Sequence, residues 1–214
     1  MLSAARRIAR GFSFIALAGW AINAPAQEVA PDVLVKDVTL EVVDIVRKDR
    51  DIQAGDRKKI IDLVETKVLP HFDFNGMTGL ALGPHWPKAN AEQKKQLTYE
   101  FRTLLVRTYA SAISAYRDQK FDFRPLRLKP TDTDVTVQVR VMQSGAQPIS
   151  IDYGMEKTAG GWKVYDVIVG GVSLVANYRT EFGNQVRDAG IDGLIKSIAA
   201  KNRSNAALSS AEKK

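Results

Sequence analysis

The stretch Trp162–Phe182, WKVYDVIVGGVSLVANYRTEF, changes from a strand pattern to a helix pattern, and this change decides the fold. Its first part, up to Val169, is β-branched and aromatic, which is the composition of a β-strand. Gly170-Gly171 interrupts that run, and Ser173 follows as a candidate helix N-cap. Apolar residues then recur at helical spacing. The sequence therefore predicts a strand that turns directly into an amphipathic helix, with apolar surface on both.

Three further strands precede this stretch in the sequence. Phe121–Leu128 alternates with a phase shift at Arg124-Pro125, as a bulge or an edge kink would require. Val135–Val141 and Ile149–Met155 alternate cleanly between apolar and polar residues. Short turns join the runs, so we expect a four-stranded antiparallel meander with one apolar face.

Helical periodicity flanks these strands on both sides. The first predicted helix is Pro31–Arg47, and the second is capped by Asp56 and ended by Pro70. The third begins at the pair Asn90/Gln93, which resembles a capping box, and continues to Tyr116. A fourth runs from Ser173 to Gly190, and a last one covers Ile191–Ile198. Helices before and after an antiparallel sheet predict an α+β fold, with the helices packed on one face of the sheet. We expect a single domain over residues 27–202 and a flexible polar tail over 203–214.

The first 26 residues have the pattern of a cleaved secretory signal peptide. Three arginines precede the apolar run Phe12–Ile22, and Ala24-Pro25-Ala26 supplies small residues at a cleavage site. The alternative is a membrane anchor, but the apolar run is shorter than the roughly 20 residues that span a bilayer. We therefore expect an exported mature chain.

Composition narrows the possible functions. The chain contains no cysteine, which excludes a disulfide framework in an exported protein. The formal net charge is +7, and removal of the three leader arginines leaves +4. Basic residues are interspersed with acidic ones, so nucleic-acid binding is not expected. A weakly positive surface suits contact with anionic membranes or acidic partners.

Candidate catalytic residues are few. His71 and Asp73 form a His-x-Asp pair that is able to act as a general base with an orienting carboxylate, and they are the basis of an alternative, enzymatic interpretation. Two histidines without cysteine do not form a typical zinc site, so no metal is expected. Ser173 lacks the second glycine of a nucleophile elbow and is better explained as a cap. Asp166 interrupts an apolar strand; it either faces solvent or receives a hydrogen bond or salt bridge, with Arg179 as a candidate partner.

Two sets of motifs closely resemble the MlaC family, whose members are periplasmic phospholipid-transport proteins also called toluene-tolerance proteins. The first set is Phe72-Asp73-Phe74, Met77-Thr78, Ala81-Leu82-Gly83, Trp86, Gln93–Phe101 and Leu105–Tyr109. The second set is Tyr165-Asp166-Val167, Gly171-Val172-Ser173-Leu174 and Asn177-Tyr178-Arg179 through Phe182. The resemblance runs in order across nearly the whole mature chain.

This resemblance implies a shuttle of the Gram-negative periplasm with a helix-wrapped sheet, similar in shape to the nuclear-transport-factor (NTF2-like) fold. It implies a deep apolar pocket for phospholipid and no catalysed reaction or cofactor. It also implies transient contacts with an outer-membrane lipoprotein–porin complex and with an inner-membrane ABC transporter that carries MCE domains, and so a role in outer-membrane lipid asymmetry. We expect the carrier to be a monomer.

The pocket walls follow as a hypothesis from these patterns. The expected sheet wall comprises Val137, Val139, Val141, Ile149, Ile151, Tyr153, Val167 and Val169. The expected helical wall comprises Leu105, Tyr109, Leu174, Val175 and Tyr178. In the last strand, Val164 and Ile168 compete with Val167 and Val169 for the inward positions. A well-packed core with no hollow is the competing interpretation.

Overall fold

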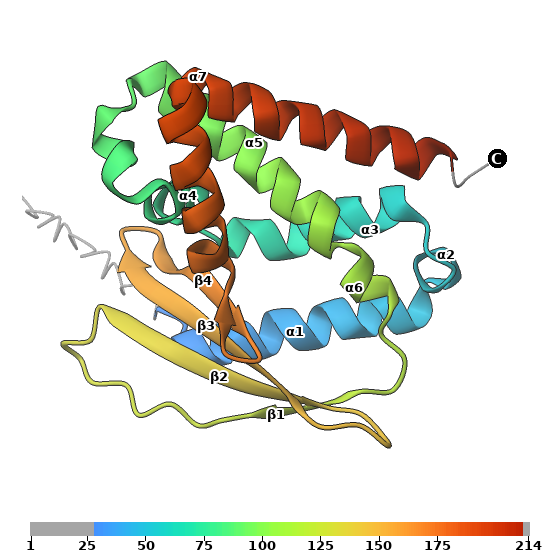
Figure 1. Cartoon of the computed structure of the whole chain (residues 1–214). Helices are drawn as coiled ribbons and strands as arrows, with labels where there is room; N and C mark the ends of the chain where they lie inside the picture. Colours follow the sequence, from blue (N-terminus) through green and yellow to red (C-terminus); the bar gives the residue numbers. More distant parts are fainter. Residues whose placement is uncertain (1–27, 212–214) are drawn as a thin grey trace, which may run out of the picture.

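A computed structural model describes residues 28–211, so the predicted signal peptide and the last three residues lie outside the described part of the chain. Within it, helices form one layer and an antiparallel sheet forms the other (Figure 1). This confirms the predicted α+β fold. No helix between residues 28 and 211 is both long enough and apolar enough to cross a membrane.

The sheet has five strands in sequential order. They are β1 (Lys120–Phe123), β2 (Asp134–Met142), β3 (Ile149–Thr158), β4 (Gly161–Val169) and β5 (Val172–Ser173). Each strand pairs antiparallel with the next. The meander was expected to have four strands; the fifth arises because the chain after Gly171 pairs for two residues with β4 before the helix begins. The first strand is shorter than expected, since it ends at Phe123.

A β-bulge resolves the register of β4. Met155 lies opposite Val164, whereas Gly154 lies opposite Asp166, so Tyr165 is the extra residue. Beyond the bulge, Val167 lies opposite Tyr153. Because cross-strand partners share a face, Val164 and Val167 both join the apolar face although three positions separate them.

The helices precede and follow the sheet. They are α1 (Pro31–Lys48), α2 (Arg50–Gln53), α3 (Arg57–Leu63), η1 (Val64–Val68), η2 (Leu69–His71), α4 (Phe74–Leu82), η3 (Gly83–Lys88), α5 (Ala91–Tyr109), α6 (Ser111–Ser114) and α7 (Leu174–Ala211). Local sequence explains where several helices begin. Asp56 caps α3 by accepting hydrogen bonds from the amides of Lys58 and Lys59, and Asn90 caps α5 in a capping box with Gln93. The third predicted helix is divided into α5 and α6 instead of continuing to Tyr116.

Helix α7 has two arms that meet at Gly190, where φ is 70° (Figure 1). The predicted break at this glycine is therefore confirmed. Helix α7 continues to Ala211, so the described residues after 202 are helical, and the flexibility of the tail stays a prediction. Long-range contacts hold this part: the buried Asn202 donates to the Glu100 carbonyl at 2.9 Å, and Arg107 donates to the Asn202 carbonyl at 2.6 Å.

Candidate functional site

The buried apolar residues of the described chain fall into three clusters instead of one continuous core. One cluster lies among α4, α5 and α7 around Phe101 and Phe182. A second joins the sheet to Val35 of α1, and a third surrounds Val46, where α1 meets α2 and α3. A small domain ordinarily has one contiguous core. Phe72, which is partly buried, packs against both the first and the second cluster and so connects the helices with the sheet.

The apolar face of the sheet becomes more accessible toward one end. Near the bulge the face is closed, with Met155 at 0% and Val164 at 3% exposure. Tyr153 and Val167, one pair further along, are only half-buried. At the far end, Ile149 is 41% and Val169 is 40% exposed. Side chains that packed against a covering layer throughout would all be buried, so the helices leave this face uncovered toward Ile149 and Val169.

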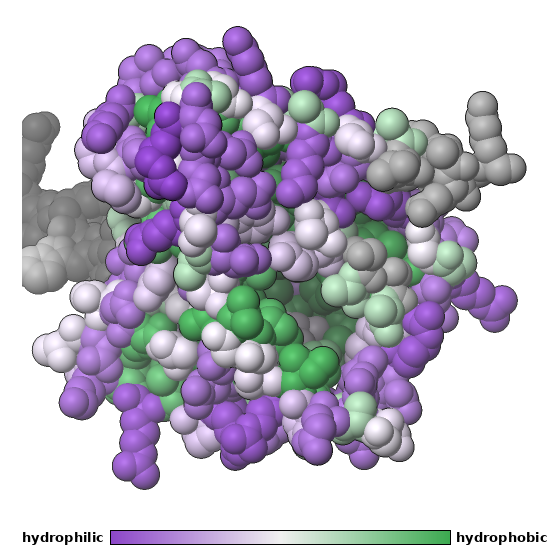
Figure 2. Space-filling view, in the orientation of Figure 1, coloured by the Kyte–Doolittle hydropathy of each residue, from purple (hydrophilic) through white to green (hydrophobic). Residues whose placement is uncertain are grey.

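Figure 2 shows a hollow between the sheet and the helices, visible at the surface as a recess with hydrophobic side chains along it. The β4–β5 hairpin, central in Figure 1, borders the recess, and its Val172 is 60% exposed. Burial also raises the pKa of Tyr153 to about 12, although the side chain keeps accessible surface.

The predicted sheet-wall residues share one face of the structure. Val137 lies opposite Tyr153, Val139 opposite Ile151 and Val141 opposite Ile149, while Val167 and Val169 continue the face on β4. Val137 and Val139 are buried in the sheet cluster, and the others are half-buried or exposed. The structure thus brings these residues together; whether they contact a ligand stays a prediction.

The predicted helical-wall residues divide into two groups. Leu105, Val175 and Tyr178 are buried in the helical cluster, where the Tyr178 ring packs edge-on against Phe101 at 5.0 Å between centroids. Tyr109 is 40% exposed, and Leu174 is half-buried. Burial, with a contribution from Tyr109, raises the pKa of Tyr178 to about 12. The first group is thus held mainly within the helical layer.

The strand-to-helix junction is held by Asp166. Its carboxylate accepts hydrogen bonds from the Val167 amide at 2.8 Å, the Ser173 hydroxyl at 2.5 Å and the Val175 amide at 3.2 Å. Ser173 accepts the Ala176 amide at 2.9 Å and so caps α7, as predicted. The suggested partner Arg179 is wrong, because its Nε donates to the Leu80 carbonyl at 2.9 Å.

Asp73 of the predicted pair His71/Asp73 serves as a helix cap. The Asp73 carboxylate accepts the Asn75 amide at 3.0 Å and caps α4. Burial, followed by nearby Lys163, lowers the pKa of His71. Among the hydrogen bonds of residues 28–211, none joins His71 to Asp73, and the same residues contain no cluster of three metal-ligating side chains.

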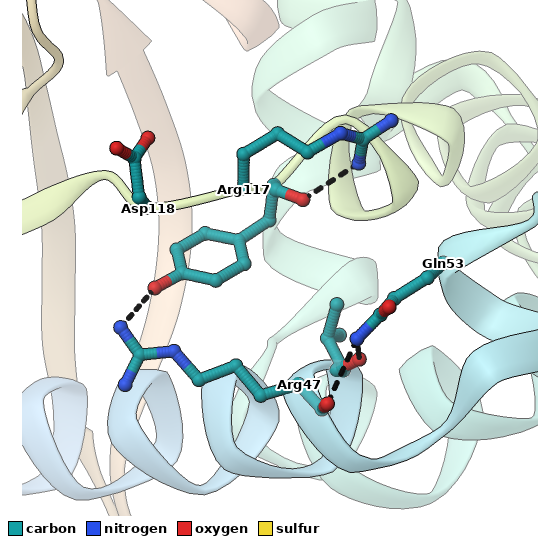
Figure 3. A pocket seen from close by; sticks show the side chains of 6 residues that line it. Arg47, Gln53, Arg117 and Asp118 are labelled. Carbon is teal, nitrogen blue, oxygen red and sulfur yellow. Dashed lines mark hydrogen bonds between the residues drawn. The ribbon is translucent and has the colours of Figure 1, made fainter.

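Sequence reasoning missed a second, more polar cavity of about 480 Å³. It is lined by Val46, Arg47, Gln53, Tyr116, Arg117 and Asp118, from α1, α2 and the segment after α6 (Figure 3). Its size falls within the range of about 300–1,000 Å³ that ligand pockets usually have. Nothing in the local sequence marks it, because its residues are separated by some 60 positions and meet only in the folded chain.

The structure thus combines an antiparallel sheet, a helical layer and an apolar recess between them. The sequence pattern of one protein family, described as MlaC protein, matches residues 36–200. The chain belongs to this MlaC family.

Relatives and a solved structure agree with that assignment. The chain is 24% identical over 171 residues to the intermembrane phospholipid transport system binding protein MlaC of Haemophilus influenzae, covering 78% of this chain and 80% of the relative. It is 23% identical over 179 residues to the toluene tolerance protein ttg2D of Pseudomonas putida, covering 83% and 82% respectively. The phospholipid-binding protein of Ralstonia solanacearum, solved in complex with a phospholipid, is 34% identical with a TM-score of 0.77, covering 83% of this chain and 99% of that one.

Proposed function

We propose that this chain is a periplasmic carrier that holds a phospholipid between its sheet and its helices. The observation that supports this most strongly is the half-buried middle of the sheet's apolar face, at Ile151, Tyr153 and Val167. Family membership and the phospholipid complex of the Ralstonia protein support the same ligand class.

The energetics of lipid transfer explain why such a carrier is useful. Burial from water stabilises each methylene by about 0.8 kcal/mol, so two acyl chains with roughly 30 methylenes gain on the order of 20 kcal/mol. A free lipid therefore leaves a membrane very slowly. A protein interior that offers comparable burial makes the transfer nearly isoenergetic, and the direction is then set by the membrane complexes at either end.

The finer parts of the proposal concern location and partners. The leader pattern supports export to the periplasm. The relative from Haemophilus influenzae is named as part of an intermembrane phospholipid transport system. We extend this role to the present chain: it exchanges lipid with an outer-membrane lipoprotein–porin complex and an inner-membrane MCE-domain ABC transporter, and so maintains outer-membrane lipid asymmetry. The carrier itself performs no chemical step.

Lipid analysis of three purified mature proteins tests the proposal. Wild type should release phospholipid on solvent extraction, detected by mass spectrometry. Ile151→Trp places a large ring in the hollow and should reduce the extracted phospholipid several-fold. Gln138→Trp adds the same ring on the exposed opposite face of the sheet and should leave the lipid content unchanged. Wild-type protein without phospholipid, or equal lipid in all three proteins, would contradict the proposal.

A further inference from the structure

We propose that Arg47 forms an oxyanion site for the phosphate of the bound phospholipid, in the cavity that it shares with Tyr116 and Gln53. This inference rests on the proposed function and adds to it the group that recognises the polar part of the lipid. It follows from the charge of Arg47, from the way its backbone is held, and from the position of the cavity beside the sheet.

Arg47 carries a positive charge that no carboxylate of residues 28–211 neutralises through an ion pair. Its guanidinium donates to the neutral Tyr116 hydroxyl at 2.5 Å and lies 5.4 Å from the centre of that ring. Asp118 lines the same cavity, but Figure 3 shows its carboxylate turned away from Arg47. A guanidinium has five N–H donors in a planar fork that matches phosphate oxygens, so Arg47 keeps donors for an anion.

The backbone around Arg47 is held in place by Gln53. The Gln53 side-chain amide donates to the Val46 carbonyl at 2.9 Å and to the Arg47 carbonyl at 2.8 Å (Figure 3). Asp49, between them, caps α2 by accepting the amides of Asp51 and Ile52. These bonds fix the turn from α1 to α2, so the base of the Arg47 side chain has a defined position at the edge of the cavity.

The cavity adjoins the apolar face of the sheet through aromatic rings. Tyr116 stacks on Phe121 with 6.2 Å between centroids, and Phe121 stacks on Phe123 at the same distance. Phe121 lies opposite Val141, which places it on the apolar face of the sheet. A molecule with apolar chains against that face and an anionic group near Arg47 would fit both surfaces, and a phospholipid has this chemistry.

This arrangement predicts a specific kind of selectivity. All phospholipids share the phosphate, whereas their headgroups differ beyond it. An arginine that contacts the phosphate therefore favours phospholipids over uncharged lipids with the same acyl chains and distinguishes poorly among headgroups. Arg117 also lines the cavity, and its side chain donates to the Tyr116 carbonyl at 2.7 Å.

A competition experiment tests the inference. The mature protein is incubated with vesicles of phosphatidylethanolamine and diacylglycerol with identical chains, and the bound lipids are counted by native mass spectrometry. Wild type should favour the phospholipid. Arg47→Gln should lower this preference about tenfold, the size expected for one lost charge-assisted hydrogen bond. Arg47→Lys should keep part of it. Arg50→Gln, which removes a nearby exposed arginine outside the cavity, should match wild type.

The outcomes separate this inference from the proposed function. Lipid bound by all proteins, with an unchanged preference in Arg47→Gln, overturns the Arg47 site and leaves the carrier function intact. No lipid in any protein overturns the carrier function itself. A parallel ³¹P NMR titration with inorganic phosphate distinguishes the two sources of oxyanion: binding of inorganic phosphate to the lipid-loaded protein at Arg47 would assign the cavity to a free anion and contradict the proposal.

Discussion

At the scale of single residues, Asp166 shows how a polar group inside an apolar strand serves the fold. It accepts three hydrogen bonds, two of them from the first residues around the start of α7. A carboxylate near a helix N-terminus is also favoured by the helix dipole. The residue therefore joins β4 to α7 at the edge of the recess, and a catalytic role is not needed to explain it.

Asp166→Ala should lower the free energy of unfolding by about 2–3 kcal/mol, because it leaves a part-buried amide and hydroxyl without their acceptor. Urea denaturation followed by circular dichroism measures the change. Asp37→Ala, which removes an exposed carboxylate from α1, should stay within about 0.5 kcal/mol of wild type. Equal losses in both variants would show that the junction does not depend on Asp166.

At the scale of elements, the β4–β5 hairpin sets the edge of the recess. Val169 lies opposite Val172, so only Gly170 and Gly171 form the turn, with φ values of 58° and 85°. Two successive positive φ angles are the geometry of a type I′ turn, which suits the twist of antiparallel strands. Both glycines are thus required by the turn.

Two glycine-to-alanine variants should change stability in opposite directions. Gly171→Ala forces a Cβ atom into a left-handed conformation and should destabilise the protein by about 1–2 kcal/mol. Gly183→Ala lies in the first arm of α7, where a Cβ would meet only Arg187 at 3.8 Å, and should stabilise by about 0.5–1 kcal/mol. Thermal unfolding measures both; a stabilised Gly171→Ala would argue against the turn assignment.

At the scale of the whole molecule, the helical layer is joined to the sheet beside the closed end of the hollow. Phe72 forms an isolated bridge with Val164, and the Asp73 amide donates to the Val164 carbonyl at 2.9 Å. Asp73 also shares a hydrogen bond with Glu156 of β3. Burial, followed by this contact with Asp73, raises the pKa of Glu156. Two carboxyl groups thus meet where the layers join.

The stability of the protein should depend on pH through Glu156. Since its pKa is raised by folding, the protonated form favours the native state below the ordinary value of 4.5, and this contribution is lost as the pH rises through the native pKa. Glu156→Gln should therefore be more stable than wild type at pH 7 to 8, with the advantage disappearing below about pH 4. Denaturation midpoints across this pH range test it, with Glu92→Gln as a control for charge loss at an exposed site. A constant difference at all pH values would exclude this cause.

The sequence by itself determined the elements and most of their boundaries. Capping by Asp56, Asn90 with Gln93, and Ser173 was predictable because each cap involves residues two or three positions apart. The faces of β2 and β3 were predictable as well, since strict alternation assigns every second residue to one face. Membership of the MlaC family was also predictable, because the motifs that indicate it are local in the sequence.

Only the tertiary structure decided the rest. The inward positions of Val164 and Val167 depend on a bulge opposite Gly154, where the Tyr165 ring passes within 3.1 Å of the space a Cβ would occupy. The helix beyond residue 203 follows contacts of Asn202 with α5, about 100 positions away. The hollow depends on how far apart the two layers pack, and the Arg47 cavity depends on how α1, α2 and the segment after α6 meet. Periodicity assigns a side chain to a face, but the distance between two faces depends on every side chain between them.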